Sequence, residues 1–275
     1  MSKNISVIRN INSEPPFFLF RPNILKKNVS FFLENFPGKV LYALKANPSE
    51  IVIKSIKKAG VRSFDAASLN EIKKIRSIFK NAEIFFMNPV KSKNSIAEAY
   101  FKYNIKHFSL DDEGELNKIL IETDGAKDLH LHLRLSIPNN FAKIKISNKF
   151  GASKKKAPEL LRKMNNFSSK IGLSFHPGSQ CMDPEAYKIA MKISSDVIEK
   201  SGIDIDFLNV GGGFPVKSPG LNPLPLINYF RVIKNELKKI KNKKKIILLS
   251  EPGRALVSEC ISLVVRVELR KGCKL

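Results

Sequence analysis

The sequence Leu129-His130-Leu131-His132-Leu133-Arg134-Leu135-Ser136-Ile137 alternates strictly between apolar and polar side chains. Such an alternation predicts a β-strand, because successive side chains of a strand point to opposite faces of the sheet. We expect the leucine face to pack against surrounding helices. The opposite face, which carries His130, His132 and Arg134, is expected to line the interior of a closed sheet. The strand therefore predicts a sheet with helices outside and polar groups inside.

Seven further segments are short, apolar and rich in β-branched residues. They lie at residues 39–45, 62–66, 83–88, 106–110, 171–176, 206–210 and 245–251. Amphipathic stretches with helical spacing lie between the strands, at residues 49–59, 68–79, 112–123, 184–200 and 226–241. Strands that alternate with helices along a whole chain are typical of a parallel α/β sheet. Eight such strands predict a (β/α)8 TIM-type barrel.

A further apolar run at residues 261–270 predicts a ninth strand. A lone strand cannot satisfy its own backbone hydrogen bonds. We therefore expect this strand to pair with the barrel, with another subunit or with a segment outside this sequence.

Composition narrows the class of protein. Of the 275 residues 43% are hydrophobic, yet no long uncharged apolar stretch occurs, so we expect a soluble, cytoplasmic protein without a membrane contact. Cys181, Cys260 and Cys273 are far apart and lack a Cys-x-x-Cys spacing. This spacing argues against a disulfide framework or a zinc site.

The net charge of +23 arises from 48 Lys and Arg against 25 Asp and Glu. Such an excess can indicate a nucleic-acid binder. The lysines are spread along predicted helices and turns, however, and no zinc-finger, RNA-recognition or basic-zipper signature accompanies them. We therefore expect no nucleic-acid partner, but a preference for anionic ligands, including phosphates.

Function in a TIM-type barrel lies at the carboxyl ends of the strands. Each predicted strand of this chain ends in or near a polar residue or a glycine run. These residues are Lys45, Asp65, Asn88, Asp111, Arg134, His176, the run Gly211, Gly212 and Gly213, and Glu251 with Arg254. One polar residue after a strand is usually part of a turn. Together they predict a single site with a lysine, acids, a histidine and an anion cradle.

Lys45 ends the apolar run that begins at Tyr42. Burial of an unpaired ammonium is costly, so we expect desolvation to lower the pKa of Lys45 toward that of a reactive amine. A lysine in that state is suited to form a Schiff base with a carbonyl group. The alternative is an ordinary strand-end lysine whose stem is buried and whose ammonium reaches water.

The glycine run and the segment from Glu251 to Arg254 predict anion binding. The glycines let backbone amides approach an oxyanion closely, although a tight turn is the alternative. Arg254 is expected to contact a phosphate, unless it forms an ion pair with Glu251. Glu251 follows an apolar run, where a carboxylate is costly without a cationic partner such as a protonated pyridine nitrogen.

The four histidines are interpreted in two ways. His176 ends a predicted strand, where its flat ring could stack on another ring. We interpret His107, His130 and His132 as hydrogen-bonded residues that line the barrel. His130 and His132 share a strand face and suggest a metal pair, but no third ligand accompanies them, so no metal site is predicted.

Five motifs follow one another along the chain. They are Tyr42-Ala43-Leu44-Lys45-Ala46-Asn47, Phe64-Asp65-Ala66-Ala67-Ser68, His176-Pro177-Gly178-Ser179-Gln180, Gly211-Gly212-Gly213-Phe214-Pro215 and Glu251-Pro252-Gly253-Arg254. In this order they resemble the alanine-racemase-like barrel family of pyridoxal-phosphate enzymes, and within it the ornithine/diaminopimelate/arginine decarboxylase group. Residues 211–215 and 149–152 look most like ornithine decarboxylases.

The resemblance implies pyridoxal 5'-phosphate as the cofactor and a role for each matching residue. It implies three catalytic residues: Lys45 as the Schiff-base lysine, Glu251 as the partner of the pyridine nitrogen, and His176 stacked on the ring. The other matches would contact the cofactor: Asp65, Arg134 and Ser179 beside it, and Gly211, Gly212, Gly213 and Arg254 around its phosphate. The implied reaction is decarboxylation of a basic amino acid, with conversion of ornithine to putrescine, a step of polyamine biosynthesis, as the first choice.

Two features differ from the family pattern. Pro177 stands where an aliphatic residue is usual after the histidine. The family also has a mostly β second domain, which completes the site of a homodimer. We expect residues 1–15 to form an N-terminal extension, residues 16–257 the barrel, and residues 258–275 only the first strand of that second domain. This chain alone is then expected to be a poor decarboxylase, and a homodimer when the second domain is present.

Two alternative functions stay open. One is a barrel-only protein that binds pyridoxal phosphate without decarboxylase activity. Glu251 argues against it, because a non-catalytic binder has little need for a strong electron sink. The other is a decarboxylase that acts on lysine or diaminopimelate, because the residues that discriminate these substrates lie largely in the family's second domain.

Overall fold

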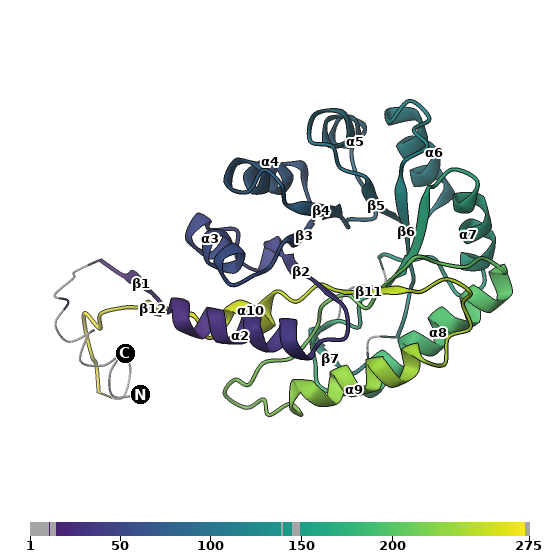
Figure 1. Ribbon diagram of the computed structural model, residues 1–275. Helices are drawn as coiled ribbons and strands as arrows, with labels where there is room; N and C mark the ends of the chain where they lie inside the picture. Colours follow the sequence, from purple (N-terminus) through teal and green to yellow (C-terminus); the bar gives the residue numbers. More distant parts are fainter. Residues whose placement is uncertain (1–10, 12–14, 139, 145–148, 273–275) are drawn as a thin grey trace.

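The computed structural model describes residues 11, 15–138, 140–144 and 149–272. Its centre is a closed barrel with the strand order β2-β3-β4-β5-β6-β8-β10-β11 (Figure 1). These parallel strands are β2 (Lys39–Ala43), β3 (Ser63–Ala66), β4 (Glu83–Phe86), β5 (His107–Leu110), β6 (His130–Arg134), β8 (Lys170–Ser174), β10 (Phe207–Asn209) and β11 (Ile247–Ser250). All overlap the predicted strands, so the (β/α)8 TIM-type barrel is confirmed.

Helices surround the barrel on its outside (Figure 1). They are α2 (Pro22–Asn35), α3 (Glu50–Lys58), α4 (Leu69–Ile78), α5 (Lys93–Ala97) with the π-helix η2 (Glu98–Lys102), α6 (Glu113–Glu122), α7 (Ala157–Asn165), α8 (Glu185–Ser201), α9 (Leu226–Leu237) and α10 (Arg254–Val257). The five stretches predicted as helices correspond to α3, α4, α6, α8 and α9. None of the helices in the described residues is long and apolar enough to cross a lipid bilayer.

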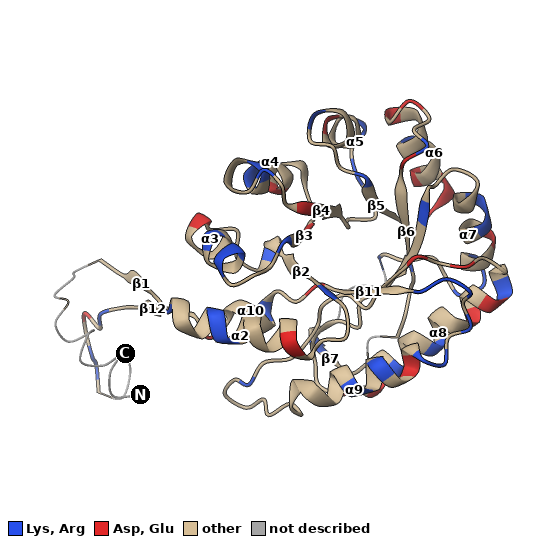
Figure 2. Ribbon diagram, viewed as in Figure 1, with Lys and Arg blue, Asp and Glu red and all other residues tan. Residues whose placement is uncertain are grey.

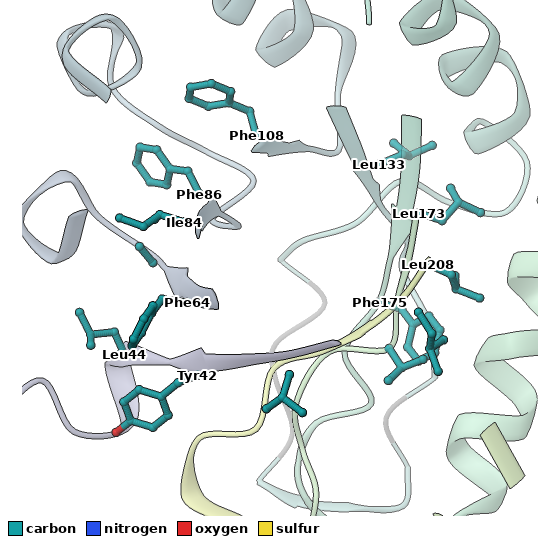
Figure 3. Packing of buried hydrophobic residues seen from close by; sticks show 14 of the residues in the cluster. Tyr42, Leu44, Phe64, Ile84, Phe86, Phe108, Leu133, Leu173, Phe175 and Leu208 are labelled. Carbon is teal, nitrogen blue, oxygen red and sulfur yellow. The ribbon is translucent and has the colours of Figure 1, made fainter. Parts of the chain in front are cut away.

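The two faces of β6 are buried in different surroundings, as predicted. Leu131 and Leu133 are fully buried in the layer between strands and helices. Figure 3 shows the same arrangement around the barrel, where side chains such as Phe64, Phe108 and Leu208 point outward from their strands. The packing of this outer layer explains why alternate residues of the strands are apolar.

His132 lies on the opposite face of β6, inside the barrel, between the rings of Phe85 and Phe207. Its Nε2 is 3.0 Å from Nδ1 of His107, whose Nε2 is 3.0 Å from Nδ1 of His130. The interpretation of the three histidines as a hydrogen-bonded barrel lining is confirmed.

A two-stranded antiparallel sheet extends away from the barrel (Figure 1). It consists of β1 (Phe17–Phe20) and β12 (Ile261–Val264), with Phe17 opposite Val264. The predicted ninth strand is therefore shorter than residues 261–270, because β1 offers no partner beyond Val264. The guanidinium of Arg21 holds this sheet to the start of α2 by donating to the carbonyl of Glu259 at 2.9 Å.

Basic and acidic residues are interspersed on most helices of the outer ring (Figure 2). Several form pairs on the surface, such as Lys54 with Glu50 and Lys163 with Glu113. Exposed pairs of this kind contribute little stability, typically about 0–1 kcal/mol. The excess of lysine is therefore a property of the solvated surface rather than of the packing.

Candidate active site

A cavity of about 520 Å³ opens at the carboxyl ends of the barrel strands. Six of the ten residues that the family resemblance assigns to the site line it: Lys45, His176, Ser179, Gly213, Glu251 and Arg254. The other four do not line it but act on residues that do. Asp65 contacts Lys45, Gly211 and Gly212 pack against Glu251, and the charge of Arg134 acts on Glu251. The placement of these ten residues is consistent with the prediction that separate strand ends converge on one site. Asn88 and Asp111, which were predicted for the same site, are not part of this lining: the Asn88 amide donates to the carbonyl of Val90, and Asp111 lines a second cavity.

Lys45 lies in a single turn of 3-10 helix, η1 (Leu44–Ala46), that follows β2. Its Nζ is 2.9 Å from Oδ2 of Asp65 on the neighbouring strand β3. The Lys45 side chain is 53% exposed, whereas Asp65 is 2% exposed. The lysine is thus held at the cavity wall by a buried carboxylate.

The prediction that the pKa of Lys45 is lowered is wrong. The Asp65 carboxylate raises the pKa of the Lys45 ammonium above its ordinary value, and this effect outweighs the lowering caused by burial. The sequence argument considered burial alone. In the structure Lys45 is a protonated, ion-paired group that must lose its proton before it can act as a nucleophile.

The segment after β3 keeps Asp65 in place. The Oγ of Ser68 accepts a hydrogen bond from the N–H of Glu71 at 3.3 Å, which caps the start of α4. In return, Oε2 of Glu71 accepts from the N–H of Ala67 at 2.6 Å. This reciprocal arrangement fixes the strand-to-helix junction that directly follows Asp65.

Glu251 is 4% exposed and directly follows β11. Its Oε1 accepts a hydrogen bond from Nδ2 of Asn209 at 2.7 Å. Burial raises the pKa of Glu251 to about 7, and repulsion from Asp65 adds to this, whereas Lys45 and Arg134 act in the opposite direction. A carboxyl group in this state can hold or release a proton near neutral pH.

Arg254 is exposed at the start of α10 and lines the same cavity. Within the described part of the chain, no ion pair joins Arg254 to Glu251. The alternative reading of these two residues as an ordinary ion pair is therefore wrong. Their side chains are separate groups, one basic and one acidic, facing the same space.

His176 lies in the loop after β8, two residues beyond the end of that strand. Its Nδ1 accepts a hydrogen bond from the N–H of Gly178 at 3.1 Å, which leaves the proton of a neutral ring on Nε2. Burial, followed by the positive charges of Arg134 and Lys45, lowers the pKa of His176 well below its ordinary value. The ring is therefore a neutral, flat surface at the cavity.

Backbone packing requires all three glycines of the run. A Cβ at Gly211 would lie 2.2 Å from the carbonyl oxygen of Phe175, and one at Gly212 would lie 2.5 Å from that of Glu251. At Gly213, where φ is +89°, a Cβ would lie 2.3 Å from the carbonyl oxygen of Gly178. The loops after β8, β10 and β11 can approach this closely only without side chains.

The carbonyl groups of the run are all held by the protein. They accept hydrogen bonds from the N–H of Glu251, the hydroxyl of Tyr187 and the N–H of Cys181, at 2.8, 2.8 and 2.9 Å for Gly211, Gly212 and Gly213 respectively. The N–H of Gly211 donates to Oδ1 of Asn209 at 2.9 Å. Among the described residues, no acceptor is found for the N–H groups of Gly212 and Gly213. Neither amide is used by the part of the protein that the structure describes, and Gly213 also lines the cavity, so its amide is open to an anion there.

Asn209 and Tyr187 were not predicted as site residues. Asn209 appeared only as a member of a predicted strand, and Tyr187 only as one residue of an amphipathic helix. A signal existed for Asn209, because an amide side chain within an apolar strand needs polar partners. Tyr187 gave no such signal, since buried tyrosines are common on helices that face a core.

No cluster of three or more His, Cys, Asp or Glu side chains with metal-binding geometry occurs in the part of the chain that the structure describes. The histidines inside the barrel bond to one another, and the acids at the cavity face cations and amides.

Residues 23–258 match the family described as pyridoxal-dependent decarboxylase, pyridoxal binding domain. The chain belongs to this family. A lysine/ornithine decarboxylase of Selenomonas ruminantium is 30% identical over 260 residues, which cover 92% of this chain and 64% of the relative. The diaminopimelate decarboxylase of Helicobacter pylori strain J99 is 32% identical over 276 residues, covering 93% of this chain and 66% of that protein.

A solved structure of a variant of SrLDC in complex with PLP is similar to this barrel, with a TM-score of 0.84 and 25% identity. The similarity covers 99% of this chain and 71% of that chain. The chain thus spans about two thirds of the length of such decarboxylases. The resemblance inferred from five motifs is confirmed at the level of the family, and pyridoxal phosphate is the cofactor of this domain.

Proposed function

We propose that the protein acts in the pyridoxal-phosphate-dependent decarboxylation of a basic amino acid, with ornithine as the substrate and putrescine as the product. The observation that carries this proposal is the joint placement of Lys45 and Glu251 on one cavity. One is a lysine on a buried carboxylate and the other a buried acid with a pKa of about 7. A protein that only stores the cofactor needs the lysine but not the acid.

The residues present fit pyridoxal phosphate. The free amides of Gly212 and Gly213, with Ser179 and Arg254, form an anion cradle for the phosphate. Glu251 would pair with the pyridine nitrogen and neutral His176 would face the ring, while Lys45 would attach to the aldehyde carbon. When bound, the cofactor supplies an electron sink for the electron pair left by the departing carboxylate.

The chain's own residues control protons around this chemistry. Asp65 keeps the charge of Lys45 at the cavity wall and, 2.9 Å from Nζ, is the nearest acceptor for its proton. Oε1 of Glu251 accepts from Asn209, whereas Oε2 has no partner among the described residues and would be the oxygen that shares a proton with a ring nitrogen. The positive charge of Arg134 favours the ionised form of Glu251, and so would offset the repulsion between the carboxyl groups of Glu251 and Asp65.

The cavity lining itself does not select among the basic amino acids. Glu251 is the single acid among its described lining residues, and the proposal assigns it to the cofactor. The preference for ornithine over lysine or diaminopimelate is therefore based on residues 211–215 and 149–152. We also propose a cytoplasmic homodimer once a second domain is present, because that domain completes the partner's site in the decarboxylase group.

Release of carbon dioxide from labelled ornithine, lysine and diaminopimelate tests this function. It should be measured for this chain, for a version extended with a C-terminal domain of the family, and for Lys45→Ala in both. We expect weak turnover by this chain, higher turnover of ornithine by the extended form, and none by either Lys45→Ala variant. Cofactor binding without turnover by the extended form would favour the alternative of a non-catalytic binder. Equal turnover by both forms would show that the barrel is sufficient.

A further inference from the structure

Asn209 is the last residue of β10 and is fully buried. Both ends of its side-chain amide are used. Nδ2 donates to Oε1 of Glu251 at 2.7 Å, and Oδ1 accepts from the N–H of Gly211 at 2.9 Å. One side chain therefore connects the buried acid on one side with the glycine run on the other.

These two partners fix the orientation of the amide. If the amide were reversed, its oxygen would face the Glu251 carboxylate and its NH2 group would face the N–H of Gly211. Both contacts would be repulsive, so one orientation is retained. The backbone of Asn209 is fixed as well, because its carbonyl accepts from the N–H of Phe175 at 3.0 Å. Two side-chain hydrogen bonds and one backbone hydrogen bond therefore hold the residue in place.

Two consequences follow for the cavity. Oε1 of Glu251 is held by Asn209, so the carboxyl group has a defined rotation, and Oε2 has no partner among the described residues. The N–H of Gly211 is also occupied, which leaves the next two amides of the run to an anion. The same side chain thus determines which oxygen of the acid and which amides of the run can be used.

We propose that Asn209 is a positioning residue that holds the Glu251 carboxylate and the glycine run in one fixed arrangement. The inference rests on the proposed function in taking Glu251 and the run as the two ends of one cofactor site. A residue of this kind matters because a site contributes most when its groups are oriented before the ligand binds.

Three variants separate this role from ordinary packing. Asn209→Leu removes both contacts at similar volume. Asn209→Asp keeps the acceptor for Gly211 but replaces the donor to Glu251 by a carboxylate. Tyr187→Phe removes only the hydroxyl that donates to the carbonyl of Gly212, and so loosens the same run without touching Glu251. Ser194→Ala serves as a remote control, since its hydroxyl is buried within α8 and bonds to Ala190.

The first measurement is the titration of Glu251 in the cofactor-free protein. The infrared band of the protonated carboxyl group, assigned by its loss in Glu251→Gln, reports this titration. Loss of a hydrogen bond to a charged group should raise the pKa of Glu251 by about one unit in Asn209→Leu. Asn209→Asp should raise it at least as much, because a second carboxylate disfavours ionisation. Tyr187→Phe and Ser194→Ala should leave it unchanged.

The second measurement is the affinity for pyridoxal phosphate, with the site of attachment mapped after borohydride reduction. Asn209→Leu should weaken binding by about tenfold or more while Lys45 remains the labelled residue at saturation. Tyr187→Phe should weaken binding without a change in the titration of Glu251. If Asn209→Leu does not fold, Asn209→Asp, which retains the shape of the side chain, decides the question.

Two results distinguish the inference from the function it rests on. An unchanged titration of Glu251 in folded Asn209 variants would overturn the positioning role even if the cofactor binds to Lys45. Failure of the wild-type protein to attach the cofactor at Lys45 would overturn the proposed function, while the titration would still report on Asn209.

Discussion

The two ends of the barrel interior both contain buried titratable residues, which are neutral at one end and charged at the other. Toward the amino ends of the strands, His107, His130 and His132 bond to one another, and burial lowers the pKa of each. At the carboxyl ends, Lys45 is paired with Asp65 beside the buried carboxyl of Glu251. The first group is neutral and its rings bond to one another, although Nδ1 of His132 is buried without a partner among the described residues. The second group keeps charges that face a cavity.

A single strand, β6, contributes to both groups. Its first residue, His130, joins the histidine chain, and its last, Arg134, acts on the charges of the cavity. The comparison teaches that a polar residue inside a barrel is not by itself a sign of function. What matters is whether the residue faces a cavity that a ligand can enter, as Lys45 and Glu251 do and His132 does not.

The largest expected effect concerns the carboxyl group of Glu251, which faces the cavity and is open to a ligand. Glu251→Gln should lower the rate of decarboxylation by about 10²–10⁴-fold, because the group can no longer hold and release a proton. Cofactor affinity should change little. Arg254→Ala should do the reverse, weakening affinity more than rate. Steady-state kinetics and cofactor titration of the extended enzyme check both, and the opposite pattern would show that the two roles have been exchanged.

The next effect concerns the close packing around the glycine run. Gly211 and Gly125 have similar positive φ angles, +69° and +63°, but a Cβ at Gly125 would meet nothing within 4 Å. Gly125→Ala should therefore cost only about 1 kcal/mol of unfolding free energy, for the backbone conformation. Gly211→Ala should cost several kcal/mol and weaken cofactor binding. Equal costs in urea unfolding would show that the close approach can relax.

A smaller effect is the pH dependence of stability, which has opposite signs for the buried histidines and for Glu251. The pKa of His132 is lowered to about 3, against about 6.5 when unfolded, so the unfolded chain binds more protons in this range. The stability associated with His132 is complete above pH 6.5 and is lost as the pH falls, by up to about 1.4 kcal/mol per unit. Glu251, with its pKa raised to about 7, acts oppositely: its contribution is complete below about pH 4.5 and is lost as the pH rises through 7.

Urea unfolding at pH 7 and pH 5 checks these signs. The wild-type protein should be less stable at pH 5, since three histidines oppose one glutamate. His132→Gln should reduce the difference between the two pH values, and Glu251→Gln should increase it. A stability that rises on acidification in the wild type would mean that the histidines are not neutral in the folded barrel.

The smallest effect lies outside both groups, in the sheet formed by β1 and β12. Phe18 and Leu263 are 73% and 56% exposed and are partners in its register. Leu263→Lys should change the free energy of unfolding by less than about 0.5 kcal/mol but reduce self-association, because exposed apolar strands promote it. Light scattering at increasing concentration measures this. Unchanged association would show that this face is not responsible.

The barrel was predictable because each strand carries its own local signal. Residues 129–137 gave both faces of β6 correctly, and the other strands differed from prediction mainly at their ends. The pairing of β1 with β12 was not predictable, because its partners are more than 240 residues apart and no local pattern links them. The length of the predicted ninth strand was wrong for the same reason.

The candidate site was predictable in position but not in its electrostatics. The order of strand ends brought Lys45, His176 and Glu251 to one cavity. The pKa of Lys45 is raised and not lowered as predicted, because its partner, Asp65, comes from the adjacent strand. Asn209 was overlooked because its partner Glu251 lies 42 residues further along the chain and only the fold brings the two together. Sequence patterns locate such residues, but their protonation states depend on neighbours that only the fold brings together.

Borohydride reduction of the purified protein with pyridoxal phosphate, followed by peptide mapping, tests the central claim most directly. Lys45 should carry the label, and Lys45→Ala should carry none. Lys54→Ala, which alters an exposed lysine on α3, should be labelled as fully as the wild type. Labelling of Lys91, the lysine buried against Glu115, or of scattered surface lysines would contradict the claim that the cavity at the carboxyl end of the barrel is the cofactor site.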